Sequence, residues 1–205
     1  MKQPTSRILY NYWNDVRGKR LAPTRLEIEP ARMGAVLSET FILERASALS
    51  YPFRLAGTRV SEYFGMALRG TDFAALAGDE PHRLLKVMQA VTAQGATAVF
   101  EFGAETDDGR TASFEAIVLP LLHPTDQVTR YLGALSAIDP PAWLGTEAVE
   151  PTGLIAHETV WPDGRPHGLL DCNDRQEPFI PELAAARIVR FHRRQFRILD
   201  GGRKS

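Results

Sequence analysis

Residues 51–73 read YPFRLAGTRVSEYFGMALRGTDF, and this is the most informative stretch of the chain. Phe53 and Leu55 alternate with other residue types, a period of two that predicts a short strand over residues 53–56. Gly57 breaks this strand. The helical turn that follows carries three apolar residues, Val60, Tyr63 and Phe64. Two further glycines precede the apolar end of the stretch. The pattern therefore predicts a strand that gives way at once to short helical segments.

The rest of the chain alternates between helical and strand periods. Apolar residues at helical spacing predict three helices, over residues 6–17, from Pro30 onward and over residues 79–94. Alternation with a period of two predicts four more strands, over residues 40–45, 97–104, 110–119 and 130–138. The run Asp107-Asp108-Gly109 is a strong hairpin signal between two of them. This order predicts an α+β fold, a five-stranded antiparallel sheet with helices on one face.

The chain is predicted to have three parts. They are an N-terminal helical cap (residues 1–38), a core (39–140) and a C-terminal extension (141–205). Residues 140–180, which begin at the end of the core, are rich in Pro and Gly and predict an irregular connection. The chain carries a formal net charge of −1. Residues 187–204 alone carry +6, so the remainder carries −7. The sequence therefore predicts a basic tail attached to an acidic body.

The order of elements over about residues 39–140 resembles the PAS fold, in which a strand and short helices wall a small-molecule pocket. The chain is also similar to a family of small bacterial proteins with a single PAS domain. Short segments carry that similarity: Tyr12-Trp13, Arg17-Gly18, Pro23-Thr24-Arg25, Arg54-Leu55-Ala56-Gly57-Thr58 and Phe64-Gly65. The resemblance covers about the first two-thirds of the chain. It implies a sensor or a scaffold.

The resemblance also implies one apolar cavity on the helical side of the sheet. Strand alternation and helical spacing place nine candidate ligand-binding residues there: Phe41, Leu43, Leu55, Thr58, Phe64, Phe73, Leu84, Met88 and Phe114. Thr58 follows a glycine break, so capping of the short helix is an alternative role for it.

No cofactor can be named from the sequence. A photoactive flavin-binding PAS relative needs a cysteine on a helix beside the flavin, and the single cysteine, Cys172, lies in the C-terminal extension. Haem-binding relatives use a histidine on the long helix, where His82 lies on the side away from the apolar stripe. Neither flavin photochemistry nor haem ligation is therefore expected.

Enzyme signatures are missing from the sequence. It contains no Gly-x-Ser-x-Gly elbow, no phosphate-binding glycine loop and no His-Glu-x-x-His motif. His157-Glu158 begins the last pattern, but Trp161 stands where its second histidine is required. The paired carboxylates Asp107 and Asp108 are explained by their place in a turn. We therefore assign no catalytic and no metal-binding residues and expect a non-enzymatic protein.

Two segments are candidates for partner contacts. Tyr12 and Trp13 carry too much apolar surface to be left in water, which predicts packing either on the sheet or across a homodimer interface. The tail places apolar residues on one side of a helical wheel and four arginines on the other, Arg190, Arg193, Arg194 and Arg197. This tail has three alternative roles: packing on the chain's own body, contacting a partner or second copy, and binding a membrane surface or nucleic acid.

These observations predict a single-domain PAS protein of bacterial signal transduction. It would act as a non-enzymatic sensor or scaffold through ligand-modulated protein contacts or dimerisation, with a regulatory protein or a second copy as partner and a small apolar molecule as ligand. Residues 1–7 are polar and no stretch is apolar enough to span a membrane, so a cytoplasmic location is expected. Nucleic-acid binding is not expected because the body is acidic. The alternatives are a membrane or nucleic-acid adaptor acting through the tail, and a small-ligand enzyme using the PAS cavity.

Overall fold

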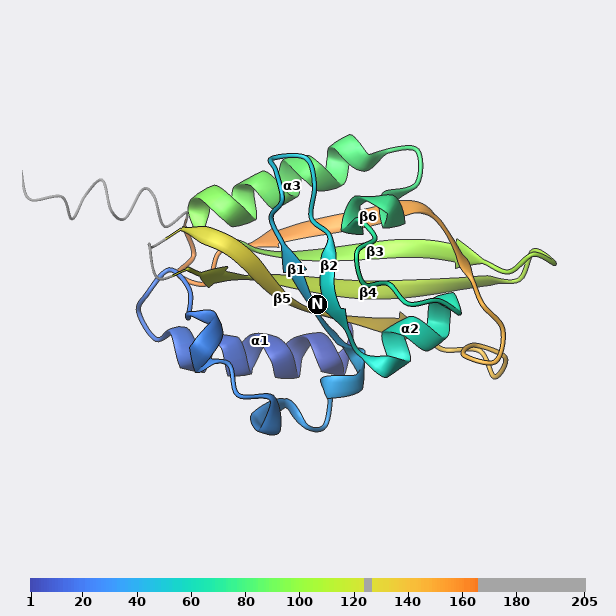
Figure 1. Cartoon of the computed structure of the whole chain (residues 1–205), viewed down its shortest axis with the longest axis horizontal. Coiled ribbons are helices and arrows are strands. Elements are labelled where there is room, and N and C mark those ends of the chain that lie inside the picture. Colours follow the sequence, from blue (N-terminus) through green and yellow to red (C-terminus); the bar gives the residue numbers. More distant parts are fainter. Residues whose placement is uncertain (124–126, 166–205) are drawn as a thin grey trace, which may run out of the picture. The chain divides into compact units, whose positions relative to one another are not determined.

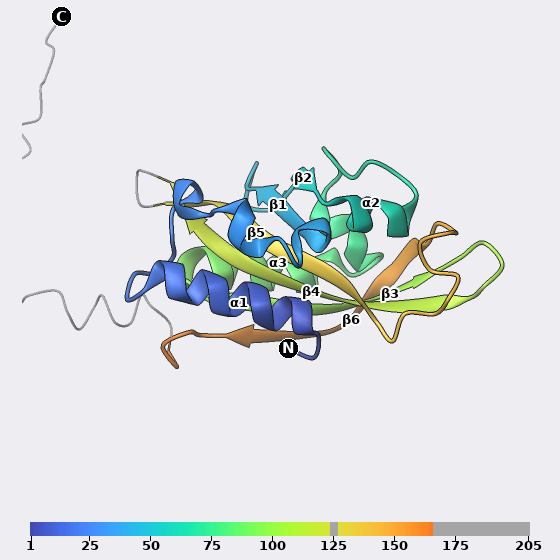
Figure 2. The same cartoon turned by 90° about the horizontal axis from the view of Figure 1, so that it is seen from below.

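Six antiparallel strands form one sheet, and helices cover both of its faces (Figure 1, Figure 2). The computed structural model describes residues 1–123 and 127–165. In chain order the elements are α1 (Pro4–Arg17), the 3₁₀ helices η1 (Arg25–Glu27), η2 (Pro30–Met33) and η3 (Leu37–Glu39), β1 (Thr40–Glu44), β2 (Phe53–Ala56), α2 (Thr58–Phe64), η4 (Phe73–Ala77), α3 (Pro81–Gln94), β3 (Thr97–Glu105), β4 (Thr111–Leu122), β5 (Val128–Ile138) and β6 (Glu150–Val160). The strands lie in the order β2-β1-β5-β4-β3-β6. The predicted α+β fold is confirmed, and a sixth strand is added to the five that were predicted.

Strand β6 lies within residues 140–180, where the sequence predicted an irregular connection, and that prediction is wrong for residues 150–160. β6 pairs with β3 at the edge of the sheet. Two register shifts in this pairing leave Ile155 and Thr152 without a partner residue, and the second lies between Pro151, which has no N–H to donate, and Gly153, whose φ is 141°. Leu154 is buried while most of the strand is exposed, so β6 carries a weak hydrophobic pattern.

The helices divide between the two faces of the sheet. α2, η4 and α3 pack on one face, as predicted for the core. The N-terminal cap packs on the opposite face (Figure 2). Its core joins side chains of the cap to side chains of β4 and β5, namely Leu9, Tyr12, Trp13, Ile28, Met33, Ile117, Leu119, Leu121 and Leu132. The sheet is therefore buried on both sides, with a separate apolar core on each.

Tyr12 and Trp13 pack on the sheet, the first of the two predicted arrangements. Trp13 is fully buried, and its Nε1–H donates a hydrogen bond of 2.8 Å to the carbonyl oxygen of Pro120 in β4. The Tyr12 hydroxyl accepts a hydrogen bond of 2.7 Å from the backbone N–H of Glu29. Both rings are buried in the interior. Their predicted role in partner binding stays a prediction.

A β-bulge between β1 and β2 corrects the predicted position of Leu55. Ile42 pairs with Leu55 and Leu43 pairs with Phe53, so two neighbouring residues of β1 lie opposite three residues of β2. The extra residue, Arg54, breaks the alternation of faces. Phe53 is buried in the core on the helical side, whereas Leu55 is 51% exposed. Leu55 was predicted to line the cavity on that side, and this placement is wrong.

A buried glutamate from the sheet caps the first helix. Glu115 of β4 is 2% exposed, and its carboxylate accepts hydrogen bonds from the backbone N–H groups of Lys2 (2.5 Å) and Gln3 (3.0 Å) at the start of α1. Burial disfavours its charged form, but the hydrogen bonds from these two N–H groups, together with the nearby Ser6 side chain, outweigh burial and lower the pKa of Glu115. A carboxylate at a helix N-terminus also suits the helix dipole. Glu115 therefore anchors α1 to the sheet.

Replacing this carboxylate is expected to loosen the cap. Glu115→Gln should lower the free energy of unfolding by about 1–3 kcal/mol near neutral pH, because the amide has one acceptor oxygen instead of two. Folding lowers the Glu115 pKa, so its stabilising contribution is present above the unfolded value of about 4.3 and is lost as pH falls through the folded value. Urea unfolding at several pH values measures this. The stability gap between wild type and variant should narrow in acid, and a gap independent of pH would contradict the assignment. Glu105→Gln, at an exposed position of β3, is the control.

Candidate functional site

Most of the predicted ligand-binding residues lie in one buried core. Seven of the nine belong to the apolar cluster on the helical side of the sheet, namely Phe41, Leu43, Phe64, Phe73, Leu84, Met88 and Phe114. The Phe73 ring is at the centre, with centroids of neighbouring rings 5.6 to 5.8 Å away, those of Phe41, Phe53, Phe100 and Phe102. These phenylalanine rings fill much of the space where the sequence predicted a cavity.

The other two predicted residues, Leu55 and Thr58, lie elsewhere. Both line a recess beside the N-terminal cap, on the opposite face of the sheet. Gly57 is the N-cap residue of α2, and the Thr58 side chain makes no capping hydrogen bond. Neither residue joins the buried core. The sequence therefore predicted one site, whereas the structure divides the predicted residues between a filled core and a recess on the other face of the sheet.

The larger recess lies at the end of the sheet where the β3–β4 hairpin meets the connection that leads into β6 (Figure 1). We name it the hairpin pocket. Its volume is about 830 Å³, and its apolar floor contains Phe53, Phe64, Leu68, Leu76 and Val149. Phe64 is thus the one residue of the nine predicted that lines it. A concave space of this size, with an apolar floor, is typical of small-molecule sites.

The wall of the hairpin pocket is held by backbone contacts. The N–H of Val149 donates a hydrogen bond of 3.0 Å to the Tyr63 carbonyl at the end of α2. Gly65 follows α2 with a φ of 60° and approaches Ala148 so closely that an added Cβ would lie 2.6 Å from the alanine Cβ. A side chain at Gly65 would therefore be strained by both its backbone and this contact. The β5–β6 connection is in this way seated on α2.

Carboxylates surround the mouth of the hairpin pocket. Its lining includes five acidic residues and no basic residue, the acids being Asp72, Asp107, Asp108, Glu147 and Glu150. Asp72 has a structural role, because its carboxylate accepts hydrogen bonds from Ala74 N–H (2.9 Å) and the Ser50 hydroxyl (2.5 Å). Asp107 and Glu150 make no side-chain hydrogen bond or ion pair within the described residues. These two carboxylates are therefore available to a cationic ligand.

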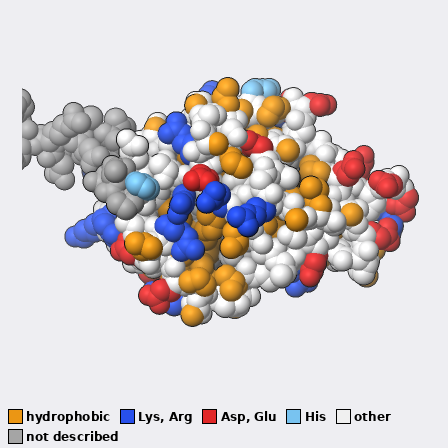
Figure 3. Space-filling view, in the orientation of Figure 1, with side chains coloured by type: hydrophobic (Ala, Val, Ile, Leu, Met, Phe, Trp, Pro, Cys, Tyr) orange, Lys and Arg blue, Asp and Glu red, His pale blue; other side chains and the backbone are white. Residues whose placement is uncertain are grey.

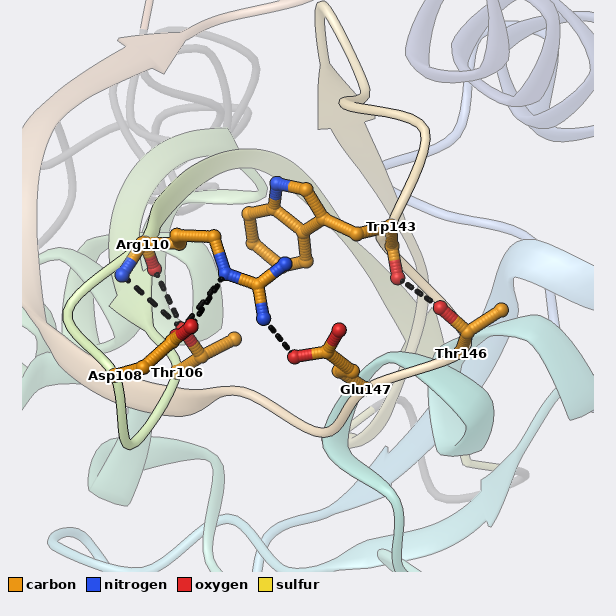
Figure 4. A network of polar contacts seen from close by, with 6 residues as sticks. All are labelled: Thr106, Asp108, Arg110, Trp143, Thr146 and Glu147. Atoms are coloured by element: carbon orange, nitrogen blue, oxygen red, sulfur yellow. Dashed lines mark hydrogen bonds and ion pairs between the residues drawn. The ribbon is translucent and has the colours of Figure 1, made fainter.

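A polar network closes one side of the pocket mouth (Figure 4). Arg110 of the hairpin forms an ion pair of 2.9 Å with Asp108 and a second ion pair with Glu147 of the β5–β6 connection. Its guanidinium lies 4.9 Å from the ring centroid of Trp143. The hydrogen bond from the Thr106 hydroxyl, followed by that from Arg110, lowers the pKa of Asp108. Arg110 therefore joins two segments that are distant in sequence and neutralises two of the five carboxylates.

Several residues of this site were not identified from the sequence. Asp107 and Asp108 were interpreted only as turn residues, and Trp143 and Glu147 lie in the segment predicted as irregular. The pairing of Arg110 with Glu147 spans 37 residues, and no local pattern indicates it. The sequence signal that could have indicated this site is the concentration of acidic residues next to the hairpin turn.

Other predicted features can be placed only in part. His82 is exposed on α3. The four tail arginines, Arg190, Arg193, Arg194 and Arg197, and Cys172 lie outside the described residues. Within residues 1–123 and 127–165, no group of three His, Cys, Asp or Glu side chains is placed to hold a metal ion. No helix in that same part of the chain is both long and apolar enough to cross a membrane.

Comparison with known proteins gives a family match and several distant structural matches. A family model described as "PAS domain" matches residues 1–136. No curated protein matches the chain. A light-oxygen-voltage domain studied with a flavin analogue is 19% identical, with a TM-score of 0.43 over 53% of this chain and 83% of that one. The LOV protein of Rhodobacter sphaeroides is 13% identical, with a TM-score of 0.41 over 50% of this chain and 60% of that one. A PAS domain from Colwellia psychrerythraea is 17% identical, with a TM-score of 0.39 over 54% of this chain and 98% of that one.

Proposed function

Because this chain belongs to the PAS domain family, whose model matches residues 1–136, we propose that it is a non-enzymatic sensor that binds a small molecule in the hairpin pocket. We further propose that the ligand controls contacts with a regulatory protein or a second copy in bacterial signal transduction, in the cytoplasm. The observation that carries this proposal is the hairpin pocket itself, a recess of about 830 Å³ next to a core filled by aromatic rings.

The lining of the hairpin pocket favours one class of ligand. The floor, with Phe53, Phe64 and Leu76, would bury an apolar body. The carboxylates of Asp107 and Glu150 at the mouth would favour a cationic group on that body over an anionic one. The ligand class that fits best is therefore a small organic cation with an apolar part.

Strand β6 offers a route from the pocket to the N-terminal cap. Its first residues, Glu150 and Pro151, line the pocket. Near its other end, Glu158 forms an ion pair of 3.3 Å with the N-terminal amino group. In the turn after β6, Asp163 pairs with the buried Arg17 at the end of α1, at 2.9 Å. A ligand that shifts the start of β6 would thus act on a segment that is tied to the residue Met1 ahead of α1 and to the last residue of α1, which is a physical basis for a change in surface contacts.

A non-enzymatic role agrees with how the polar groups of the pocket are used. Asp72 caps η4, and Asp108 and Glu147 are paired with Arg110. A general acid or base would need a carboxyl group held toward a substrate. These three carboxylates are instead engaged in local structure, and we assign the two unpaired ones, Asp107 and Glu150, to the attraction of a cationic ligand.

Binding of a charge-matched pair of fluorescent probes tests the proposal. The full chain is titrated with a dansylated alkylamine and with a dansylated fatty acid of the same length. We expect the amine to bind more tightly, by about tenfold, a difference of about 1.4 kcal/mol. Ala75→Trp, at an exposed position of the pocket lining, should weaken the amine by about tenfold or more. Ala67→Trp, exposed but outside the lining, should change binding less than about twofold.

The outcomes separate the parts of this proposal. If the Ala75→Trp variant binds the amine as tightly as the wild type does, the hairpin pocket is not the ligand site. Preference for the fatty acid, still blocked by Ala75→Trp, would keep the site and reject the cationic ligand class. Native mass spectrometry of the purified chain would show directly whether a small molecule copurifies with it.

A further inference from the structure

The second recess lies beside the N-terminal cap, on the face of the sheet opposite the aromatic core. We name it the cap groove. Its volume is about 600 Å³, and its apolar lining contains Ile28, Met33, Leu37, Ile42, Leu55 and Leu132. Leu37 and Leu55 are 40% and 51% exposed. These two leucines leave apolar surface uncovered on one groove, and its burial by a partner would be favourable.

Local backbone features form this groove. The bulge at Arg54 turns Leu55 onto this face, next to its partner Ile42. At the end of β2, Gly57 donates an N–H hydrogen bond of 2.8 Å to the Thr40 carbonyl. An added Cβ at Gly57 would lie 2.2 Å from the carbonyl oxygen of Ser38. The end of β2 is thereby held tightly against η3 and the first residue of β1, which gives the groove a preformed wall. A preformed groove binds a partner at a lower cost in conformational entropy.

The charge around the cap groove is opposite to that of the hairpin pocket. Arg25 is the one charged residue in its lining. Arg54 and Arg59, next to the lining residues Leu55 and Thr58, have side chains that are 55% and 59% exposed. Their carboxylate partners are less exposed, at 35% and 18%. Figure 3 shows basic side chains gathered over β1 and β2 beside hydrophobic ones, while acidic side chains gather toward the hairpin end.

Arg25, in the groove lining, and Arg32, next to the lining residue Met33, have no acidic partner within the described residues. Within the described residues, Arg25 donates only a long hydrogen bond of 3.4 Å to the Ile28 carbonyl. The guanidinium of Arg32 lies 5.0 Å from the Tyr12 ring centroid, and no ion pair with it is found in the described part of the chain. Both can therefore meet carboxylates from another molecule without breaking an existing ion pair.

From the apolar lining and the basic rim we propose that the cap groove docks an acidic amphipathic segment of a partner protein. Apolar side chains of that segment would fill the space over Leu37 and Leu55, and its carboxylates would lie against Arg25 and Arg32. A helix that presents an apolar stripe beside acidic residues has this chemistry. The proposal goes beyond ligand binding in the hairpin pocket, because it assigns the surface and the chemistry of the partner.

Charge also argues against the other occupants. In a symmetric dimer through this groove the same patch is used by both copies, so the two basic rims would face each other. The phosphates of a nucleic acid would pair with the arginines, but they would make no favourable contact with the leucines of the groove. The acidic amphipathic segment is the occupant that uses both features of the groove.

Peptide selection on the full chain tests this assignment without knowledge of the partner. A phage library of random peptides of about 16 residues, enough for about four helical turns, is selected against the wild-type protein. The enriched peptides should be acidic and should carry apolar residues at helical spacing. Their affinity is measured by fluorescence anisotropy. Leu55→Glu should weaken it by about tenfold or more, through loss of apolar contact and added repulsion. Leu49→Glu, 64% exposed in the β1–β2 turn and outside the groove, should change it less than about twofold.

Each other outcome overturns the proposal. Failure to enrich any peptide, enrichment of basic peptides, or equal binding by wild type and Leu55→Glu would each remove acidic-segment docking at this groove. A dimer in analytical ultracentrifugation that Leu55→Glu dissociates would assign the groove to a second copy. Binding of labelled duplex DNA that Arg25→Glu abolishes would assign it to nucleic acid. Circular dichroism of Leu55→Glu, substituted at a half-exposed position, confirms that the variant is folded.

Discussion

Replacing Trp13 by alanine is expected to lower the free energy of unfolding by about 3–5 kcal/mol. The side chain is fully buried between α1 and the sheet, and its removal leaves a cavity that the surrounding strands cannot fill. It also leaves the Pro120 carbonyl without the hydrogen bond that Nε1–H donates at 2.8 Å. The Arg17 guanidinium, 5.5 Å from the ring centroid, loses its aromatic neighbour. Urea unfolding followed by circular dichroism measures the change.

Two variants on α1 make this result specific. Trp13→Phe keeps most of the packing and loses the hydrogen bond, so we expect a smaller loss of about 1–2 kcal/mol. Ile8→Ala, at a position that is 45% exposed on the same helix, should lose about 1 kcal/mol or less. If Trp13→Ala were no more destabilising than Ile8→Ala, the packing of the cap on the sheet would be incorrect.

Replacing Phe73 by alanine is expected to have a similar effect on the other core, about 3–5 kcal/mol. Its fully buried ring contacts four other phenylalanine rings, from η4 across to β1, β2 and β3. Phe73→Leu, which removes less volume, should lose less than about 2 kcal/mol. The alanine variant should also gain a dry apolar cavity that binds benzene. Thermal unfolding with and without benzene measures both effects.

The benzene result separates a packed core from a core that already holds a space. If the rings fill the interior, benzene should raise the melting temperature of Phe73→Ala but not that of the wild type. Equal stabilisation of wild type and variant would show that a cavity exists in the wild-type core, as the sequence predicted. Leu49→Ala, at a residue 64% exposed in the β1–β2 turn, is the control for effects of benzene outside the core.

Features that depend on nearby residues could be predicted from the sequence. The short strand at residues 53–56, the hairpin at Asp107-Asp108-Gly109 and the helix with Leu84, Val87 and Met88 buried are all present in the structure. Each depends on residues within one or two turns of a helix or on neighbouring positions of a strand. Period and turn chemistry act over that range, so the sequence alone carries their signal.

Other features escaped prediction because the deciding contact is made with a distant strand. Leu55 follows Phe53 by two residues and should share its face, but a bulge in the pairing with β1 reverses it. Strand β6 contains Pro151 and Gly153, which indicate a loop when read locally. An edge strand tolerates both, because one of its sides has no partner strand.

The α+β fold, the presence of the first five strands along the chain and the place of most predicted residues in one apolar core could be derived from the sequence, because local periodicity carries these properties. Only the tertiary structure decided where the recesses lie. Arg110 meets Glu147 across 37 residues, and Glu115 meets the N–H of Lys2 across 113 residues. Such contacts depend on how the strands pair, because a one-residue shift in pairing changes the face of every side chain. The hairpin pocket and the cap groove are therefore products of strand pairing, and no local pattern in the sequence encodes either of them.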